Sequence, residues 1–348
     1  MSSNDPKKPR LNVLFELNIN TSTHQNNQNS SKDESKTAKP GLNPPQMSEG
    51  SNILTTNSLL PPHDQQDTLN TSSNFTILFP PPEVYPVYSY RKDYYDEFYY
   101  NLILEEHRFY KKINSQYMNL QKSINSQMRG ILVDWLIDIH NKCNLNKKTL
   151  FQCIYIIDAF LSNNQIAIAN FQLLGVAAAL IACKENEIIY PNLTIFLALT
   201  NNTYNLAELN DMEIEVMKKL NFDILAPTAD DFFAIIADII EFTEKQRFFG
   251  EYFLDISLLD FASLKYKPST IALACAYMVI KFFNLNITNL NALNAYQKIN
   301  YNDIIDCAKF LCNLRKYLSQ STLAAVKNKY SSNKYMNIAQ INFDNFEI

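Results

Sequence analysis

The sequence predicts an all-α fold, and three observations carry this prediction. From about Asp93 onward, apolar residues recur near every 3.6 positions, as they do on one face of a helix. The sustained alternation of apolar and polar residues that marks a strand is absent. A shift of 97 residues also places the second half of this region on the first. Together these features predict about ten helices arranged as two similar repeats behind one N-terminal helix.

The helical segments fall into two sets of five. An N-terminal helix begins near Asp93 with acidic residues, which suit the positive end of a helix dipole. Pro227 separates the two sets, and Thr228 can cap the helix that follows it. The first set is expected at 126–142, 147–162, 169–185, 192–200 and 206–220, and the second at 228–242, 245–264, 269–284, 288–297 and 301–318.

Matching segments support a duplicated five-helix unit. The stretch "GVAAALIACK" at 175–184 falls on "ALACAYMVIK" at 272–281, and Asp158 falls on Asp255. The third helix of each set is apolar nearly all round and rich in small residues. We therefore expect it at the centre of its repeat, where small side chains let neighbouring helices approach closely.

The first quarter of the chain has a different composition. Residues 1 to about 75 are rich in Asn, Ser, Thr and Gln, and such a segment buries too little apolar surface to offset its ordering entropy, so we predict disorder. A proline-rich connector follows at 78–90. The domains expected are a regulatory tail at 1–90, an N-terminal helix and connector at 91–125, the two repeats at 126–226 and 227–336, and a C-terminal tail at 337–348.

Composition argues against several classes of function. The net charge of -4 gives no general attraction to nucleic acid or to anionic membranes. No run of about 18 apolar residues and no apolar signal core suggests a membrane segment. Five glycines without a cluster make a nucleotide cofactor unexpected, and scattered histidines and cysteines offer no metal spacing. We expect no cofactor, no metal and the reduced cysteines of an intracellular protein.

The stretch "MRGILVDWLI" at 128–137 contains the only tryptophan in the chain. Its apolar residues follow helical spacing, with an arginine and an aspartate between them. A buried Arg129 needs a carboxylate, because an unpaired buried charge is costly. Asp158 lies in the apolar "IYIIDAFL" and has the same need. The two can satisfy each other, or both can reach solvent, and spacing alone does not decide between these alternatives.

Several motifs together resemble the cyclins, specifically the mitotic A/B type. They are "MRGILVDWL", "IIDAFLSNN", "QLLGVAAALIACKENEI", "TNNTYNLAELNDMEIEVMKKLNFDILAPT" and "VKNKYSSNKY". The resemblance covers about residues 93–336 and implies two tandem five-helix cyclin boxes. It also implies a regulatory subunit, not an enzyme, that binds and activates a cyclin-dependent protein kinase in G2/M control.

Five positions that are nearly fixed in the family's first box match here: Arg129, Asp158, Leu173, Lys184 and Glu213. By this resemblance Arg129 and Asp158 form the structural ion pair considered above. Lys184 and Glu213 are expected to hydrogen-bond the backbone of the kinase beside its mobile αC helix, since charged groups bind backbone amides and carbonyls strongly.

The resemblance assigns further residues to the kinase-binding surface. They are Ile181, Glu185, Met217, Phe222 and Ile224 in the first repeat, with Tyr100 and Ile103 on the N-terminal helix. Glu185 departs from the family pattern, which usually has an aromatic residue after the lysine. This change removes an apolar contact with the αC helix of the kinase.

A substrate-docking patch is the second surface implied by the resemblance. It captures Arg-x-Leu type motifs of kinase substrates or inhibitors, and its residues here are Met128, Ile131, Leu132, Trp135, Asp138, Phe171 and Gln172. Asp138 replaces a family glutamate, and Ile168 occupies a position that is basic in the family. We expect this face of the helix to point outward and Trp135 to grip the leucine of the motif.

Signals for turnover and localisation lie mostly in the tail. The stretch "RLNVLFELN" at 10–18 is a degenerate match to the RxxLxxIxN motif through which mitotic cyclins are destroyed, so a ubiquitin ligase is a candidate partner. The "KEN" at 184–186 lies at the end of a predicted helix and is interpreted as coincidence. The basic "KKPR" at 7–10 fits nuclear import, and we expect the protein in nucleus and cytoplasm.

Two alternatives remain open at this point. A cyclin-box module can act without a kinase, as in general transcription factors of the B type, which bind DNA through basic faces. The acidic pI of about 5.7 and the matched Lys184 and Glu213 argue against it. An unrelated helical enzyme has no paired carboxylates, metal cluster or nucleophile–base spacing to support it.

Overall fold

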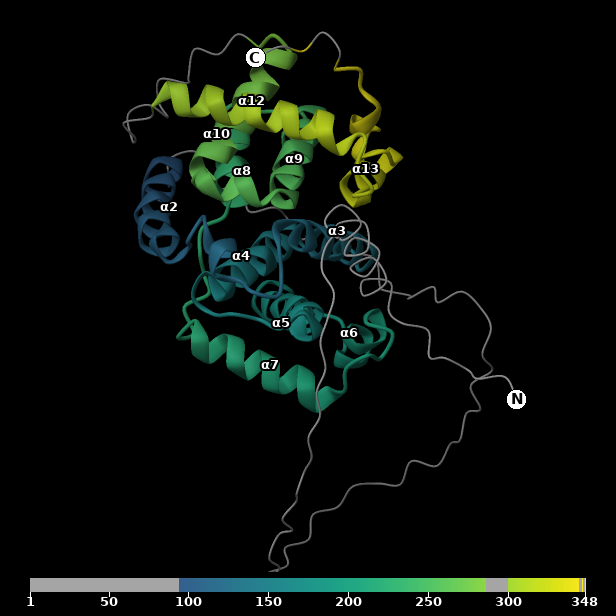
Figure 1. Cartoon of the computed structure of the whole chain (residues 1–348). Helices are drawn as coiled ribbons and strands as arrows, with labels where there is room; N and C mark the ends of the chain where they lie inside the picture. Colours follow the sequence, from purple (N-terminus) through teal and green to yellow (C-terminus); the bar gives the residue numbers. More distant parts are fainter. Residues whose placement is uncertain (1–93, 286–299, 344–345, 347) are drawn as a thin grey trace, which may run out of the picture. The chain divides into compact units, whose positions relative to one another are not determined.

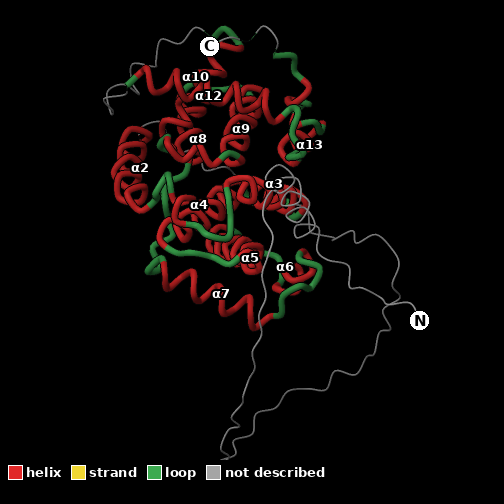
Figure 2. Tube along the Cα trace, in the orientation of Figure 1, coloured by secondary structure: helices red, strands yellow, loops and turns green. Residues whose placement is uncertain are grey.

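The computed structural model describes residues 94–285, 300–343, 346 and 348. All regular structure within these ranges is helical, as Figure 2 shows. The predicted all-α class is therefore confirmed for this part of the chain. The tail at 1–90, its two motifs and the helix expected at 288–297 lie outside the described residues.

The N-terminal helix and the first repeat closely follow the expected ranges. Helix α2 runs over Tyr95–Phe109 and continues as the short 3-10 helix η2, Tyr110–Lys112. A second 3-10 turn, η3, covers Tyr117–Leu120. The first repeat contains α3 (Ser126–Lys142), α4 (Lys147–Asn163), α5 (Ile168–Asn186), α6 (Leu193–Leu199) and α7 (Leu206–Lys219) (Figure 1).

Asparagine starts most helices of the first repeat. The side chains of Asn125, Asn146, Asn192 and Asn205 each accept a hydrogen bond from a backbone N–H in the first turn that follows. Such a cap satisfies one of the amide groups that have no partner within the helix. Asn205 also receives a reciprocal bond, because its own N–H donates to the Glu208 side chain at 2.7 Å. The abundant asparagines therefore mark the helix boundaries.

The second repeat differs from the expectation at one place. Its helices are α8 (Ala229–Ile239), α9 (Glu244–Leu259), α10 (Pro268–Phe282) and α12 (Tyr301–Leu318). The prediction of a single helix at 245–264 is wrong. The backbone of Asp260 is extended, which ends α9, and the 3-10 helix η4 follows at Phe261–Lys265. The Asp260 carboxylate caps η4 by accepting the Ala262 N–H at 2.8 Å. Thr228 caps α8, as predicted, in a capping box with Asp231.

The third helix of each repeat is buried, as its composition predicted. Residues 171–183 of α5 are all buried, and α10 buries most of its length. Helix α5 is long and apolar enough to cross a membrane, judged by length and composition alone. This finding corrects the expectation that no segment of the chain has these properties. However, 67% of its most apolar window is buried inside the fold, as a central helix requires.

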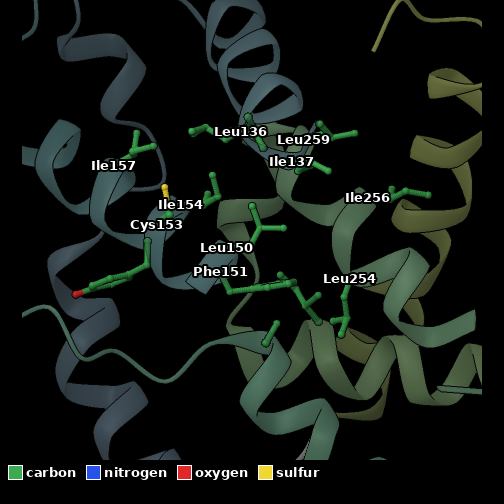
Figure 3. Close-up of a cluster of buried hydrophobic side chains, with 14 of the residues drawn as sticks. Leu136, Ile137, Leu150, Phe151, Cys153, Ile154, Ile157, Leu254, Ile256 and Leu259 are labelled. Atoms are coloured by element: carbon green, nitrogen blue, oxygen red, sulfur yellow. The ribbon is translucent and has the colours of Figure 1, made fainter. Parts of the chain in front are cut away.

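The two repeats share a continuous core. Leu136, Leu150 and Ile154 of the first repeat belong to the same buried cluster as Leu254 and Ile256 of α9, and Figure 3 shows these side chains around the junction.

The last residues complete this core. Helix α13 (Ala325–Tyr330) is followed by the 3-10 turns η5 (Asn333–Tyr335) and η6 (Ile338–Gln340). Within the segment set apart as a C-terminal tail, Ile338 and Phe343 are buried and belong to the core cluster.

Candidate partner-binding face

Lys184 and Glu213 form an ion pair on the surface of the first repeat. Lys184 lies in the last turn of α5 and Glu213 near the middle of α7, and Lys184 Nζ donates to Glu213 Oε1 at 2.6 Å. The lysine side chain is 40% exposed and the glutamate 18%. Helices α5 and α7 pack against each other, so two residues distant in sequence meet on rigid elements. The remaining donors of the ammonium group and the second carboxylate oxygen stay available to a partner.

An exposed aromatic residue follows α7. Phe222 is 68% exposed and has a left-handed backbone with φ of 57°, directly after Asn221 with φ of 52°. A bulky residue rarely adopts this conformation, and such strain gathers at functional sites. Phe222 N–H donates to Met217 O at 2.9 Å, which closes the turn. The fold therefore presents Phe222 to solvent, where an isolated surface turn would favour a polar residue.

The other residues assigned to this surface are less accessible. Ile181 and Ile224 are buried, and Met217 and Ile103 are partly buried. Tyr100 on α2 is 49% exposed. Leu225, which the sequence analysis did not single out, is exposed three residues after Phe222. The local sequence "DILAPT" does not show which of its apolar residues is exposed, because burial of residues in a connector depends on tertiary packing.

Helix α2 is attached beside this surface through Asp223. Arg108 NH2 donates to Asp223 Oδ1 at 2.9 Å, and Lys112 forms an ion pair with the other carboxylate oxygen. Burial raises the pKa of the Asp223 carboxyl group, but the hydrogen bonds and positive charges of Lys112 and Arg108 together lower it below its ordinary value. This contact brings the end of α2 next to the connector that carries Phe222.

Exposed apolar residues continue beyond Lys184. Glu185 is exposed, and the loop after α5 carries Ile188 and Ile189, which are 74% and 77% exposed. Tyr190 follows them and is 42% exposed. These three residues were not among the predicted site residues, although three consecutive apolar residues between a charged segment and Pro191 are a visible signal in the sequence. A contiguous apolar loop of this kind is unusual on a free surface.

The docking patch is not an open groove in this structure. Met128, Ile131, Leu132, Phe171 and Gln172 are buried, and only Trp135 and Asp138 are partly exposed. The expectation that this face of α3 points outward is therefore wrong for most of its residues. The physical reason is the close approach of α5: a Cβ atom at Gly175 would lie 2.8 Å from Leu132 Cδ1. The role of the patch itself stays a prediction.

Arg129 and Asp158 form the predicted buried ion pair. Arg129 Nε donates to Asp158 Oδ1 at 2.8 Å and NH2 donates to Oδ2 at 2.7 Å, in the two-point geometry that suits a guanidinium. Tyr117 OH also donates to Asp158 Oδ1, at 2.8 Å. Burial alone would lower the pKa of Arg129. The negative charge of Asp158 more than offsets this effect and raises the pKa above its ordinary value, so the arginine stays charged.

The arginine also joins the two repeats. Its NH1 donates to the carbonyl oxygen of Leu258 in α9 at 2.9 Å. Asp255, the repeat counterpart of Asp158, has its own cation: Lys329 Nζ donates to Asp255 Oδ2 at 2.7 Å. Each repeat thus keeps one buried carboxylate that receives a charge-assisted hydrogen bond. Spacing alone left the alternatives for Arg129 open, and tertiary packing decides between them.

Two other features predicted from the sequence, Leu173 and the "KEN" stretch, both lie in α5. Leu173 is a buried residue of α5. The "KEN" at 184–186 belongs to the last turn of the same helix, which supports its interpretation as coincidence. Among the described residues no group of three potential ligands could hold a metal ion.

Comparison with known proteins identifies the class. The family model "Cyclin, N-terminal domain" matches residues 97–225, and "Cyclin, C-terminal domain" matches residues 227–344. A solved viral cyclin from herpesvirus saimiri has the same fold, with a TM-score of 0.52 at 19% identity, over 67% of this chain and 96% of the viral chain. The chain belongs to the cyclin family.

The similar sequences narrow the type. The chain is 31% identical to G2/mitotic-specific cyclin-B2 of Gallus gallus over 252 residues, which is 72% of this chain and 62% of the relative. It is 35% identical to Cyclin-A1-1 of Arabidopsis thaliana over 237 residues, 66% of this chain and 52% of the relative. The chain is thus a mitotic A/B-type cyclin that spans little more than half the length of these relatives.

Proposed function

We propose that this cyclin is a regulatory subunit that binds and activates a cyclin-dependent serine/threonine kinase in G2/M control. The observation that carries the proposal is the Lys184–Glu213 pair, held at 2.6 Å on two packed helices, with Phe222 exposed in the turn after α7. A charged donor and acceptor on rigid supports can bind a partner's backbone with little ordering cost. The apolar residues around them supply the area that such contacts need for affinity.

The proposed mechanism is allosteric. An inactive kinase of this class holds its αC helix swung out, with the αC glutamate away from the catalytic lysine. The cyclin offers more contact to the swung-in state, and this difference in affinity is all that can shift the equilibrium. The kinase's own Lys–Glu ion pair then forms, and the activation loop moves with the helix.

The test is a double substitution, Lys184→Ala with Glu213→Ala, measured by co-purification of the kinase and by histone phosphorylation. We expect both kinase recovery and activity to fall at least about tenfold, because two charge-assisted hydrogen bonds are lost. The matched control is Glu244→Ala with Lys245→Ala, which removes the same charges from exposed positions on α9. Equal activation by the double variant and wild type would refute the interface.

Glu185 is proposed to adjust the choice of kinase. It is exposed next to Lys184 where relatives in the family usually carry an aromatic residue. Replacement Glu185→Phe should strengthen binding to a kinase that presents apolar residues on αC. A pull-down that recovers the same kinase at the same yield from both proteins would contradict this role.

We further propose that Trp135 and Asp138 recruit substrates or inhibitors with Arg-x-Leu type motifs. They are the accessible members of the predicted patch, with an amphipathic ring for the leucine and a carboxylate for the basic residue. Trp135→Ala should slow phosphorylation of a motif-bearing substrate and spare a short peptide without the motif. If both substrates are affected equally, Trp135 has a packing role only.

The tail motifs support two further proposals. Arg10 and Asn18 frame a degenerate destruction motif, and the basic 7–10 cluster fits nuclear import, so we place the protein in nucleus and cytoplasm with turnover through a ubiquitin ligase. Abundance across a synchronised cell cycle tests the first proposal, with Arg10→Ala expected to prolong the protein's lifetime. Imaging of a variant with Lys7 and Lys8 replaced by alanine tests the second.

A further inference from the structure

A groove runs along α2 where this helix packs against the second repeat. Its volume is about 740 Å³, and its walls are α2, the turn from η4 to α10, and the start of α12. A second hollow of about 240 Å³ adjoins it and shares five lining residues with it: Glu106, His107, Lys265, Tyr266 and Lys267. Figure 1 shows α2 alongside the helices of the second repeat. Of the residues assigned above, only Ile103 contributes to this groove.

Hydrogen bonds between Glu106 and Ser269 hold the α2 wall of the groove in place. Glu106 is 1% exposed, and its two carboxylate oxygens accept the Ser269 N–H at 2.7 Å and the Ser269 hydroxyl at 2.9 Å. These contacts fasten α2 to the first turn of α10. Tyr99 adds an edge-to-face contact with Phe232, with ring centroids 5.5 Å apart. The groove is therefore formed before any partner arrives, which lowers the entropic cost of binding.

The lining combines an apolar strip with unlike charges. Half-exposed Leu104 and partly buried Ile103 provide the apolar surface, and the buried Leu273 and Ile304 lie beneath it. Lys265 and Lys267 lie on the η4–α10 turn, while Asp303 and Asp306 lie one turn apart on α12. All four charged residues are exposed, and none forms an ion pair with another described residue.

The charged side chains remain able to bind. Lys265 Nζ lies 4.7 Å from the Tyr266 ring centroid and 5.1 Å from that of Phe310, a contact that positions the ammonium group and leaves its hydrogen-bond donors free. Asp303 accepts one bond, from Asn300 Nδ2 at 3.1 Å. Cationic and anionic walls that face one apolar strip define a demanding ligand, because a uniformly charged segment is repelled by one wall.

We propose that this groove binds an extended peptide segment of a partner protein in which an acidic and a basic side chain flank an apolar one. The acidic side chain pairs with Lys265 and Lys267, and the basic one with Asp303 and Asp306. The apolar side chain covers Ile103 and Leu104. This surface is separate from the Lys184–Glu213 pair and does not depend on the kinase role.

The test uses the full chain without kinase and fluorescein-labelled synthetic peptides. One peptide carries two glutamates, a central leucine and two lysines in that order from the N-terminus. A second peptide carries the same residues in the reverse order. Two controls replace either the glutamates or the lysines by glutamine. By fluorescence anisotropy, the better direction should bind at least about tenfold more tightly than either control, and added salt should reduce this difference.

Protein variants identify the site. Lys265→Glu with Lys267→Glu should weaken the charged peptide at least about tenfold, and Asp303→Lys with Asp306→Lys should do the same. Lys218→Glu with Lys219→Glu, on exposed positions of α7, should leave affinity unchanged. Equal binding of all peptides, no binding, or unchanged affinity in both groove variants would overturn the proposal. Because no kinase is present, such a failure leaves the activating role unaffected.

Discussion

At the scale of single residues, the buried Arg129–Asp158 pair has the largest expected effect on stability. Arg129→Met would leave the Asp158 carboxylate buried with only Tyr117 as a partner, and breaking a buried pair in this way costs about 3–5 kcal/mol. Lys142→Met removes an exposed ion pair with Asp138 from the same helix and should cost less than about 1 kcal/mol. Urea unfolding of the two variants measures both values. Similar losses would mean that the buried geometry adds nothing.

A second prediction at this scale concerns pH. Burial raises the pKa of Asp134 to about 6, against the opposing effect of the Ala325 and Ala324 N–H groups. The folded protein then binds a proton more tightly than the unfolded chain, so this residue's contribution to stability falls as pH rises from about 4 to about 6.

Asp134→Asn tests this expectation. The amide oxygen can still accept the Ala325 N–H, which donates to Asp134 Oδ1 at 2.9 Å in the wild type. Melting temperatures measured across that pH range should fall less steeply for this variant. Asp211→Asn, at an exposed position on α7, is the control and should follow the wild type. A variant with the wild-type slope would exclude a raised pKa at Asp134.

At the scale of elements, two glycines set how closely helices approach. A Cβ at Gly250 in α9 would overlap the buried ring of Phe233 in α8, whereas a Cβ at Gly175 in α5 would meet the end of the flexible Leu132 side chain. Gly250→Ala should therefore destabilise the protein by about 1–3 kcal/mol. Gly175→Ala should cost less, because alanine favours a helix by about 1 kcal/mol and leucine can shift. Chemical denaturation compares them, and the reverse order would contradict this packing.

At the scale of the whole molecule, Lys147 links the two repeats. From the start of α4 its Nζ lies 3.4 Å from Asp230 Oδ1 and 3.3 Å from Glu251 Oε2, both in the second repeat. Burial raises the pKa of Asp230 to about 6 even beside this lysine, which lowers it. Without the lysine, the carboxylates would repel one another unless one of them took up a proton.

Lys147→Met should consequently destabilise the protein more at pH 8 than at pH 5.5. At the higher pH the Asp230 carboxyl group is ionised and repels the neighbouring carboxylates, and at the lower pH its protonation relieves part of this repulsion. Lys148→Met is the neighbouring control, since Lys148 is half-exposed and pairs with Asp231 at 3.4 Å. Urea midpoints at the two pH values decide the matter. A loss that is the same at both would indicate that Lys147 acts through packing alone.

The site was predictable where its residues belong to regular helices. The 3.6-residue period and the repeat located α5 and α7, and the family resemblance then selected Lys184 and Glu213, which the structure brings to 2.6 Å. The burial of Leu132 and the attachment of α2 through Glu106 were not predictable. These features depend on which helix faces pack together, and a local pattern does not contain that information.

By itself, the sequence determined the fold class and most helix positions, because apolar periodicity and capping residues act within a few residues of chain. It also determined that Arg129 and Asp158 each needed a partner. Only the tertiary structure decided that they partner each other, that most residues of the docking patch are buried, and that a charged groove lies between α2 and the second repeat. The reason is that burial and ion pairing depend on contacts between residues far apart in the chain.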